Sequence, residues 1–215
     1  MATTASGEIS TISGNNRTET RSGTDTPEYP YQWLRSYFLK WTGKHAASPP
    51  KVILSDCIIA FVGTFISISI LAFIHYRLLD KHDLVFFIAS FGASAMILYA
   101  APSTPVAQPR NIVGGQVIGA FVGCTIRLIL GTNGETFLAL ALAVALSLFL
   151  MQITGTMHAP AGATALIAIM PIKPFPWGGF QFILMPVLSG SFILLFIAVI
   201  VNNIGSNRHY PCYWW

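Results

Sequence analysis

The sequence predicts an all-α protein, a polytopic bundle of membrane helices that contains two inverted repeats of three segments each. Three observations predict this fold: the composition, a series of six apolar blocks, and a similarity between the second and fifth blocks. Of the 215 residues, 53% are hydrophobic and only 9% are charged. A soluble domain carries about a quarter charged residues. The deficit of charge therefore excludes a soluble core and indicates an integral membrane protein.

The first 47 residues are expected to lie outside the membrane domain, which we place at residues 48–215. Residues 1–26 are rich in Ser and Thr but contain acids, which are scarce in transit peptides, so we expect a disordered tail. In residues 29–44, aromatic side chains alternate with Lys and Arg, as in an amphipathic segment at a membrane surface. No cleavable signal peptide is expected, because the first apolar run begins past residue 50.

Six apolar blocks follow, at residues 57–76, 84–101, 112–130, 137–153, 159–172 and 180–201. A helix needs about 20 residues at a rise of 1.5 Å each to cross a bilayer. Five blocks are long enough, so we expect them to cross. The fifth block would reach only about two-thirds of the way, so we expect it to be short or broken.

The basic residues near the ends of the blocks predict the orientation. With six crossings, two groups of Lys and Arg would face opposite sides: Arg35, Lys40, Lys44, Lys51, Arg110 and Arg208 against Arg77, Lys81, Arg127 and Lys173. The larger group favours the cytoplasm, so we expect both termini there. The identity of the membrane is not predicted.

The second and fifth blocks share a motif, GASA at residues 92–95 and GATA at residues 162–165, at an offset of 162 − 92 = 70. A repeat of three crossings must be inverted in its second copy. Inverted repeats with interrupted helices at matching places are typical of transporters whose site lies near the bilayer midplane. Chance similarity is the alternative, because small residues are common where membrane helices pack.

The two motifs predict an anion-binding site. If short helices begin near Gly92 and Gly162, their free N–H groups point into the membrane interior, where they favour an anion. Ser94 and Thr164 would add hydroxyl donors from the first turns. Neither motif contains an acid, which argues against a cation site.

His158 and Pro160 precede the second motif. His158 could donate to the anion or carry a proton with it, or it could simply cap the helix, and both readings remain open. The predicted substrate-binding residues are thus Gly92, Ser94, His158, Pro160, Gly162 and Thr164.

A vestibule is predicted at Gln108, Arg110 and Asn111, in the loop before the third block. Asn111 is placed to cap that helix, and Arg110 could attract anions or anchor to a lipid headgroup. Arg127, near the end of the third block, is expected to extend toward the headgroups. The stripe of Gly115, Gly119 and Gly123 predicts close helix packing, within the chain or with a second copy.

The remaining motifs exclude several classes. The three cysteines form no CxxC pair, so we expect no disulfide framework, metal or cofactor. HExxH and GxSxG are absent and no acids pair within the apolar blocks, so we do not expect an enzyme. The expected partners are a small inorganic anion and membrane lipid, with a homo-oligomer possible and no nucleic acid.

Several segments resemble the HPP family of integral membrane proteins: FGASAMILYAAP, AQPRNIVGGQVIGAFVG, HAPAGATALIAIM and the terminal YPCYWW. The resemblance covers roughly residues 48–215. The name-giving His-Pro-Pro motif reads His158-Ala159-Pro160 here, without the middle proline. The family is usually described with four spanning helices, against the six blocks found here.

What this resemblance implies is a function in transport. Members of the family are described as candidate transporters, and plant plastid members are implicated in nitrite transport. The resemblance therefore implies a carrier or channel for a small anion, with nitrite the leading candidate. The alternative is a membrane scaffold that transports nothing and recruits partners through its N-terminal tail.

Overall fold

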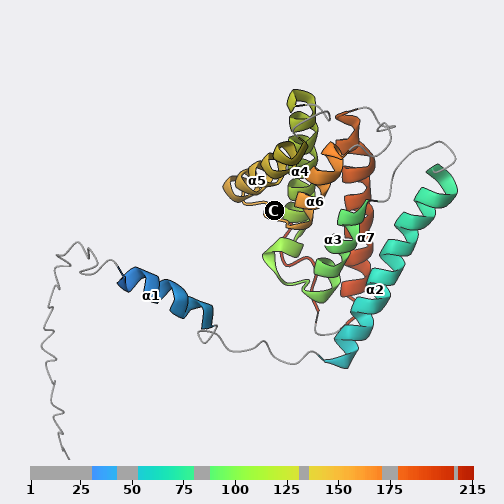
Figure 1. Ribbon diagram of the computed structural model, residues 1–215. Coiled ribbons are helices and arrows are strands. Elements are labelled where there is room, and N and C mark those ends of the chain that lie inside the picture. Colours follow the sequence, from blue (N-terminus) through green and yellow to red (C-terminus); the bar gives the residue numbers. More distant parts are fainter. Residues whose placement is uncertain (1–30, 43–52, 80–87, 131–135, 171–178, 206–207) are drawn as a thin grey trace, which may run out of the picture. The chain divides into compact units, whose positions relative to one another are not determined.

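The structure is a computed structural model that describes residues 31–42, 53–79, 88–130, 136–170, 179–205 and 208–215 (Figure 1). The chain divides into two compact units, residues 1–50 and 51–215. In the first unit, helix α1 (Gln32–Leu39) continues into a 3-10 turn (Lys40–Thr42), and the side chains of Tyr37, Phe38 and Trp41 are exposed. The tail predicted to be disordered lies outside the described residues.

The second unit confirms the predicted class, because its described residues form helices and no strand. Among the residues that the structure describes, four helical stretches are long and apolar enough to cross a membrane. They are α2 (Leu54–Phe73) with its π-helical extension (Ile74–Leu79), α4 (Pro109–Leu130), α5 (Thr136–Thr154), and a π-helical segment (Ile183–Leu188) that leads into α7 (Ser189–Asn202).

The helical path into α7 is interrupted at its start. Met185 has φ −129° and ψ 119°, which is extended rather than helical backbone, and Pro186 follows it. A proline lacks the N–H that a helix requires and crowds the preceding turn, so it kinks or breaks a helix.

Two apolar helices in the described part of the membrane domain are too short to cross a bilayer: α3 (Ala89–Ala100), with 12 residues, and α6 (Pro160–Ile169), with 10. At 1.5 Å per residue they extend about 18 and 15 Å, against a hydrocarbon core of about 30 Å. The short fifth block is therefore confirmed. The prediction that block 84–101 is a full crossing is wrong, because Ile88 is extended and the helix begins only at Ala89.

The helices of the membrane domain pack in a defined set of pairs (Figure 1). Helix α4 packs against α5 and α6, and α5 also packs against α6. Helix α7 packs against α2 and α3, and α2 also packs against α3. Two further pairs, α3 with α6 and α4 with α7, join these groups.

Helix α6 begins half-way along α4. A Cβ atom built on Gly119 would lie 2.3 Å from the carbonyl oxygen of Ala161, and one on Gly123 would lie 2.6 Å from that of Ala165. Gly119 lies 119 − 109 = 10 residues after the start of α4, which is about 15 Å along its axis. The glycine stripe therefore packs inside the chain, where the lack of a side chain allows the backbone of α6 to approach.

Helix α3 packs along α7 in the same way as α6 packs along α4. A Cβ atom on Gly190 would overlap the ring of Phe91 near the start of α3, and Asn202, the last residue of α7, donates to the carbonyl oxygen of Leu98 (3.1 Å). The end of α7 also lies beside the start of α4. Tyr210 donates its N–H to Oδ1 of Asn203, directly after α7, and its hydroxyl to the carbonyl oxygen of Ala107 (2.7 Å). Helices α3 and α6 thus end at opposite ends of the bundle.

Candidate functional site

Five buried polar side chains meet where α3 and α6 contact each other. Ser90 and Ser94 come from α3, Gln116 from α4 and Thr164 from α6, and His158 precedes α6. All five have a relative exposure of 0%. We call them the polar cluster. Polar groups buried at this depth of a membrane domain are costly unless they are hydrogen-bonded, and they commonly mark functional sites.

Hydrogen bonds link the polar cluster from end to end. His158 Nδ1 lies 2.9 Å from the carbonyl oxygen of Val106 and therefore carries a proton, because a carbonyl oxygen only accepts. In the neutral ring, Nε2 then accepts from the hydroxyl of Ser94, at 2.8 Å. That hydroxyl in turn accepts from the amide nitrogen of Gln116, at 3.1 Å.

Thr164 completes the chain on the other side of Gln116. Its hydroxyl donates to the amide oxygen of Gln116 and lies 2.7 Å from the hydroxyl of Ser90. Gln116 therefore bridges the two short helices, with its nitrogen bound to α3 and its oxygen to α6. The amide and the hydroxyl groups of the cluster carry donors that can turn toward a bound anion. None of the five side chains is an acid, so none would repel an anion.

The structure brings together three of the predicted binding residues, Ser94, His158 and Thr164. The prediction that Ser94 and Thr164 lie in the first turns of their helices is wrong, because α3 begins at Ala89 and α6 at Pro160. Ser94 is the sixth residue of its helix and Thr164 the fifth, by counting from those starts. Pro160 is buried at the first helical position, where its missing N–H costs no hydrogen bond.

Gly92 and Gly162 do not line the polar cluster. Each lies two residues from a cluster side chain on its own helix, Ser94 and Thr164, and residues two apart do not share a helix face. A Cβ atom on Gly92 would meet nothing within 4 Å, and one on Gly162 would meet only Val144, at 3.8 Å.

Sequence reasoning missed Ser90, Gln116 and the carbonyl group of Val106. A signal for Gln116 existed, because it is a polar residue inside an apolar block and directly follows Gly114 and Gly115. Nothing in the sequence indicated that Ser90 and Val106 would face the histidine and threonine of a distant segment.

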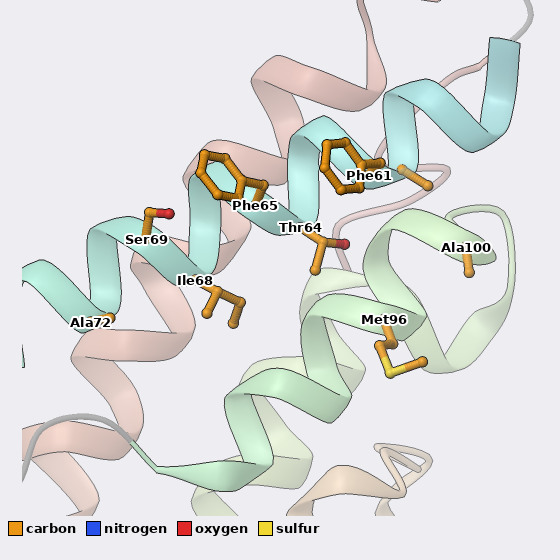
Figure 2. Close-up of a pocket in the computed structure, with 9 residues that line it drawn as sticks. Phe61, Thr64, Phe65, Ile68, Ser69, Ala72, Met96 and Ala100 are labelled. Carbon is orange, nitrogen blue, oxygen red and sulfur yellow. The ribbon is translucent and has the colours of Figure 1, made fainter.

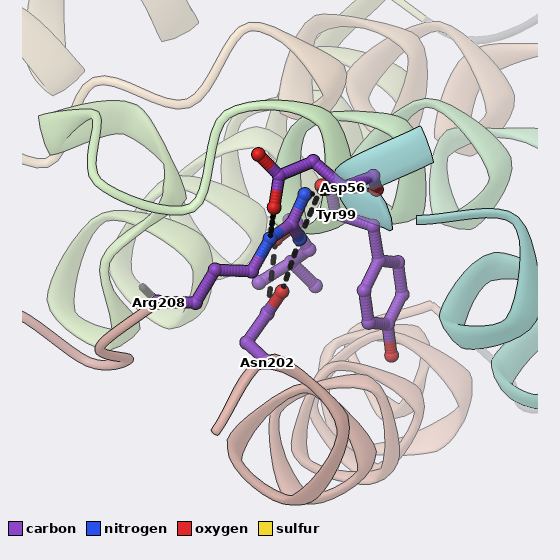
Figure 3. Close-up of polar contacts among 5 residues, drawn as sticks. Asp56, Tyr99, Asn202 and Arg208 are labelled. Atoms are coloured by element: carbon purple, nitrogen blue, oxygen red, sulfur yellow. Dashed lines mark hydrogen bonds and ion pairs between the residues drawn. The ribbon is translucent and has the colours of Figure 1, made fainter. Parts of the chain in front are cut away.

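An arginine lies at the C-terminal end of each short helix. Arg208 donates to the carbonyl oxygen of Tyr99, the penultimate residue of α3, at 3.0 Å (Figure 3). Arg127 donates to that of Ala168, the penultimate residue of α6, at 3.2 Å. A cation is favourable there, because the last carbonyls of a helix carry partial negative charge. Arg127 therefore turns inward to α6, contrary to the prediction that it extends toward the headgroups.

Arg208 also forms an ion pair with Asp56 at the start of α2, with Nε 2.9 Å from Oδ1 (Figure 3). Its other bonds go to the backbone oxygen of Asp56 (2.9 Å) and to Oδ1 of Asn202 (3.1 Å). One guanidinium thus connects the start of α2 with the ends of α3 and α7.

Burial raises the pKa of Tyr210, whose hydroxyl donates to the carbonyl oxygen of Ala107.

The predicted vestibule residues serve mainly as connections. Gln108 is fully buried, where it donates to the carbonyl oxygens of Pro102 and Thr104 and accepts from the N–H of Cys212, so it does not face a vestibule. Helix α4 begins at Pro109, so Asn111 is not its N-cap; its amide donates to the carbonyl oxygen of Met157 at 3.0 Å. Arg110 donates to that of Thr154 at 2.8 Å.

Two of the hollows among the described residues are an apolar groove and a smaller polar pocket, both outside the polar cluster. An apolar groove of about 720 Å³ runs between α2 and α3, and Phe61, Phe65 and Met96 are among the side chains on its walls (Figure 2). Its lining suits hydrocarbon rather than an anion. A smaller pocket, of about 230 Å³, adjoins Asp56 and Arg208. Neither hollow is lined by a residue of the polar cluster.

The comparison with known families identifies the chain. Residues 49–211 match the model of the HPP transmembrane region, a stretch that contains all the elements of the polar cluster. The chain belongs to the HPP family. This HPP protein is accordingly an integral membrane protein with several crossings.

Two relatives from Dictyostelium discoideum are each described simply as a transmembrane protein. One is 43% identical over 180 residues, which cover 83% of this chain and 57% of the relative. The other is 44% identical over 186 residues, covering 85% and 65%. The HPP chain thus spans about three-fifths of the length of these relatives. No solved structure matches it.

Proposed function

We propose that this HPP protein is a membrane transporter or channel for a small inorganic anion, with nitrite as the leading candidate. The observation that carries the proposal is the arrangement of α3 and α6. Two half-length helices begin near the middle of the bundle, contact each other at the polar cluster, and end at opposite ends. A passive scaffold needs no such interruption, whereas transporters use it to hold a substrate near the midplane.

The electrostatics of the two helices favour an anion between them. Each helix start carries about half a positive charge, and each helix end about half a negative charge. Arg208 and Arg127 neutralise the two ends. The polar cluster beside the two starts contains Ser, Thr, Gln and His but no carboxylate. An anion entering the cluster would therefore find uncompensated positive dipole ends together with several donors.

The helix pairs support an inverted repeat. If α2, α3 and α4 are exchanged for α5, α6 and α7, the packed pairs exchange as well: α2–α3 with α5–α6, α4–α6 with α7–α3, and α4–α5 with α7–α2. The pairs α3–α6 and α4–α7 map onto themselves. The two arginines fit the same exchange, because each bonds the penultimate carbonyl of one short helix. This is the relation expected of a pseudo-twofold axis through the cluster.

Binding would exchange hydrogen bonds within the polar cluster for bonds to the anion. The hydroxyls of Ser94 and Thr164 and the amide of Gln116 can turn from one another to the oxygen atoms of nitrite, so few donors lose a partner. Nε2 of His158 can take up a proton that accompanies the anion. The cluster is closed in the present conformation, so transport requires α3 or α6 to move.

For orientation, we propose that the bundle end with Arg110 and Arg208 faces the cytoplasm. These two arginines lie at the end where α4 begins and α7 finishes, and Arg77 and Arg127 lie toward the other end. Together with the basic residues before α2, the first group has the larger positive charge.

Nitrite uptake into liposomes that contain the purified full chain tests the proposal. We expect saturable influx above that of protein-free liposomes, with competition by nitrate and little by a large organic anion. Measurement at two pH values separates a proton-linked carrier, whose flux responds to the pH gradient, from a channel. If folded protein passes none of nitrite, nitrate and chloride, the proposal fails and the scaffold becomes the better interpretation.

A further inference from the structure

A second apolar groove lies between α4 and α7, away from the polar cluster. It has a volume of about 430 Å³ and eight lining residues: Pro109, Val113, Phe192, Leu195, Phe196, Val199, Trp214 and Trp215. From Val199 to Phe192 it follows α7 over 199 − 192 = 7 residues, or about 10 Å. Its walls offer hydrocarbon and aromatic surface along the bundle, which is suited to an extended alkyl chain.

A cation lies at one end of this groove. The guanidinium carbon of Arg110 is 6.0 Å from the centre of the Trp215 ring, and Trp215 lines the groove together with Pro109, the chain neighbour of Arg110. Arg110 is the second residue of α4, where the helix dipole disfavours a positive charge. Among the described residues, the one ion pair is that of Arg208 with Asp56, so no described carboxylate forms an ion pair with Arg110.

The position and chemistry of Arg110 indicate which kind of anion it would bind. Its described hydrogen bond, to the carbonyl oxygen of Thr154, uses one of five N–H donors. Arginine presents the remaining donors in a fork that matches phosphate. Tryptophan favours the boundary between headgroups and hydrocarbon, and Trp214 and Trp215 are 63% and 83% exposed.

We propose that the α4–α7 groove is a binding site for an anionic phospholipid. One acyl chain occupies the groove, the phosphate lies against Arg110, and Trp215 packs beside both. A phospholipid is the occupant to which we commit, because the apolar groove and the uncompensated cation share Trp215 and adjoin at Pro109. The site is independent of the proposed transport function.

The test compares lipids on the full chain purified in detergent, with bound lipid counted by native mass spectrometry. Phosphatidylglycerol should be retained over phosphatidylcholine with the same acyl chains. Arg110→Gln should weaken phosphatidylglycerol binding about tenfold, as expected for loss of one charged hydrogen bond. Arg110→Lys should retain most of the binding, and Arg77→Gln, a matched change on the exposed π-helical extension of α2, should leave it unchanged.

A second variant tests the groove itself. Val199→Trp should fill it and reduce the retention of both lipids, and an unchanged melting temperature would show that the fold is intact. Three results would overturn the proposal. Equal retention of phosphatidylglycerol by Arg110→Gln and Arg77→Gln would show that Arg110 does not bind the headgroup. Binding of glycerol phosphate as tight as that of the lipid would indicate a free-anion site. A change of oligomeric state in Val199→Trp, with lipid retention unaltered, would assign the groove to a second copy.

Discussion

The hydroxyl oxygen of Ser94 lies 2.8 Å from Nε2 of His158, and this bond joins two segments that are 64 residues apart. It connects the first half of α3 to the residue that leads into α6. The same imidazole is fixed on its other side by the carbonyl oxygen of Val106. His158 therefore holds the starts of both short helices and the loop before α4 in one arrangement.

Replacing Ser94 by alanine should destabilise the protein, because it leaves Nε2 of His158 and the amide nitrogen of Gln116 without their partner. An unsatisfied buried polar group costs about 1–3 kcal/mol. Thermal unfolding in detergent measures the effect. Ser191→Ala is the matched control, since this buried hydroxyl donates only locally, to Val187 four residues earlier in the π-helical segment, at 2.7 Å. An equal loss in the two variants would contradict the role of the Ser94 bond.

Replacing Gly119 and Gly162 by alanine should have opposite effects on the stability of the protein. A Cβ atom on Gly119 would lie 2.3 Å from the backbone oxygen of Ala161, so Gly119→Ala must push α4 and α6 apart. Overpacking of this kind costs about 1–3 kcal/mol or more. Gly162 has its nearest neighbour at 3.8 Å, so Gly162→Ala should be neutral or stabilise the helix by up to about 1 kcal/mol. Melting temperatures of the two variants decide this.

Removal of Arg208 should loosen one end of the bundle. Arg208→Gln leaves Asp56 without its ion-pair partner and Tyr99 without a donor to its carbonyl oxygen. The loss of one partner of a largely buried ion pair costs about 3–5 kcal/mol, and because the side chain of Asp56 is 30% exposed we expect less, about 2 kcal/mol.

A double-mutant cycle with Asp56→Asn separates the ion pair from the backbone bonds. If the two changes couple, the double variant should be more stable than the sum of the single losses predicts. Strictly additive losses would show that the ion pair contributes nothing. In that case the backbone bonds of Arg208 would account for its whole effect.

Much of this fold could be predicted from local sequence. The apolar blocks locate the helices, since uninterrupted hydrophobic stretches of about 20 residues have few other uses. The glycine stripe of α4 predicts a close contact, and Pro160 marks the start of α6. The length of α3 was not predictable in this way, because the apolar residues before Ala89 continue without a proline or glycine and the backbone at Ile88 is nevertheless extended.

The polar cluster was predictable only in part. Ser94 and Thr164 could be paired because they belong to similar motifs, and similar motifs in a repeat meet near its axis. His158 could be added because it closely precedes the second motif. Ser90 and Gln116 belong to no shared motif, and their roles follow from the crossing of α3, α4 and α6. Long-range contacts also decided the role of Gln108, which binds Cys212 at the far end of the chain rather than facing a vestibule.

The central claim is that an anion binds between the starts of α3 and α6. Its most direct test is the rate of nitrite influx into liposomes that contain wild-type protein, Thr164→Val or Thr125→Val. Both substitutions replace a threonine hydroxyl by a methyl group, but Thr164 belongs to the polar cluster and Thr125 donates only along α4, to Phe121.

We expect Thr164→Val to reduce the influx by about tenfold, since one donor to the anion is lost, while Thr125→Val transports like the wild type. Equal melting temperatures and equal reconstitution would exclude a folding defect. Rapid nitrite influx through Thr164→Val, at the wild-type rate, would show that the anion does not pass between the two short helices and would contradict the account.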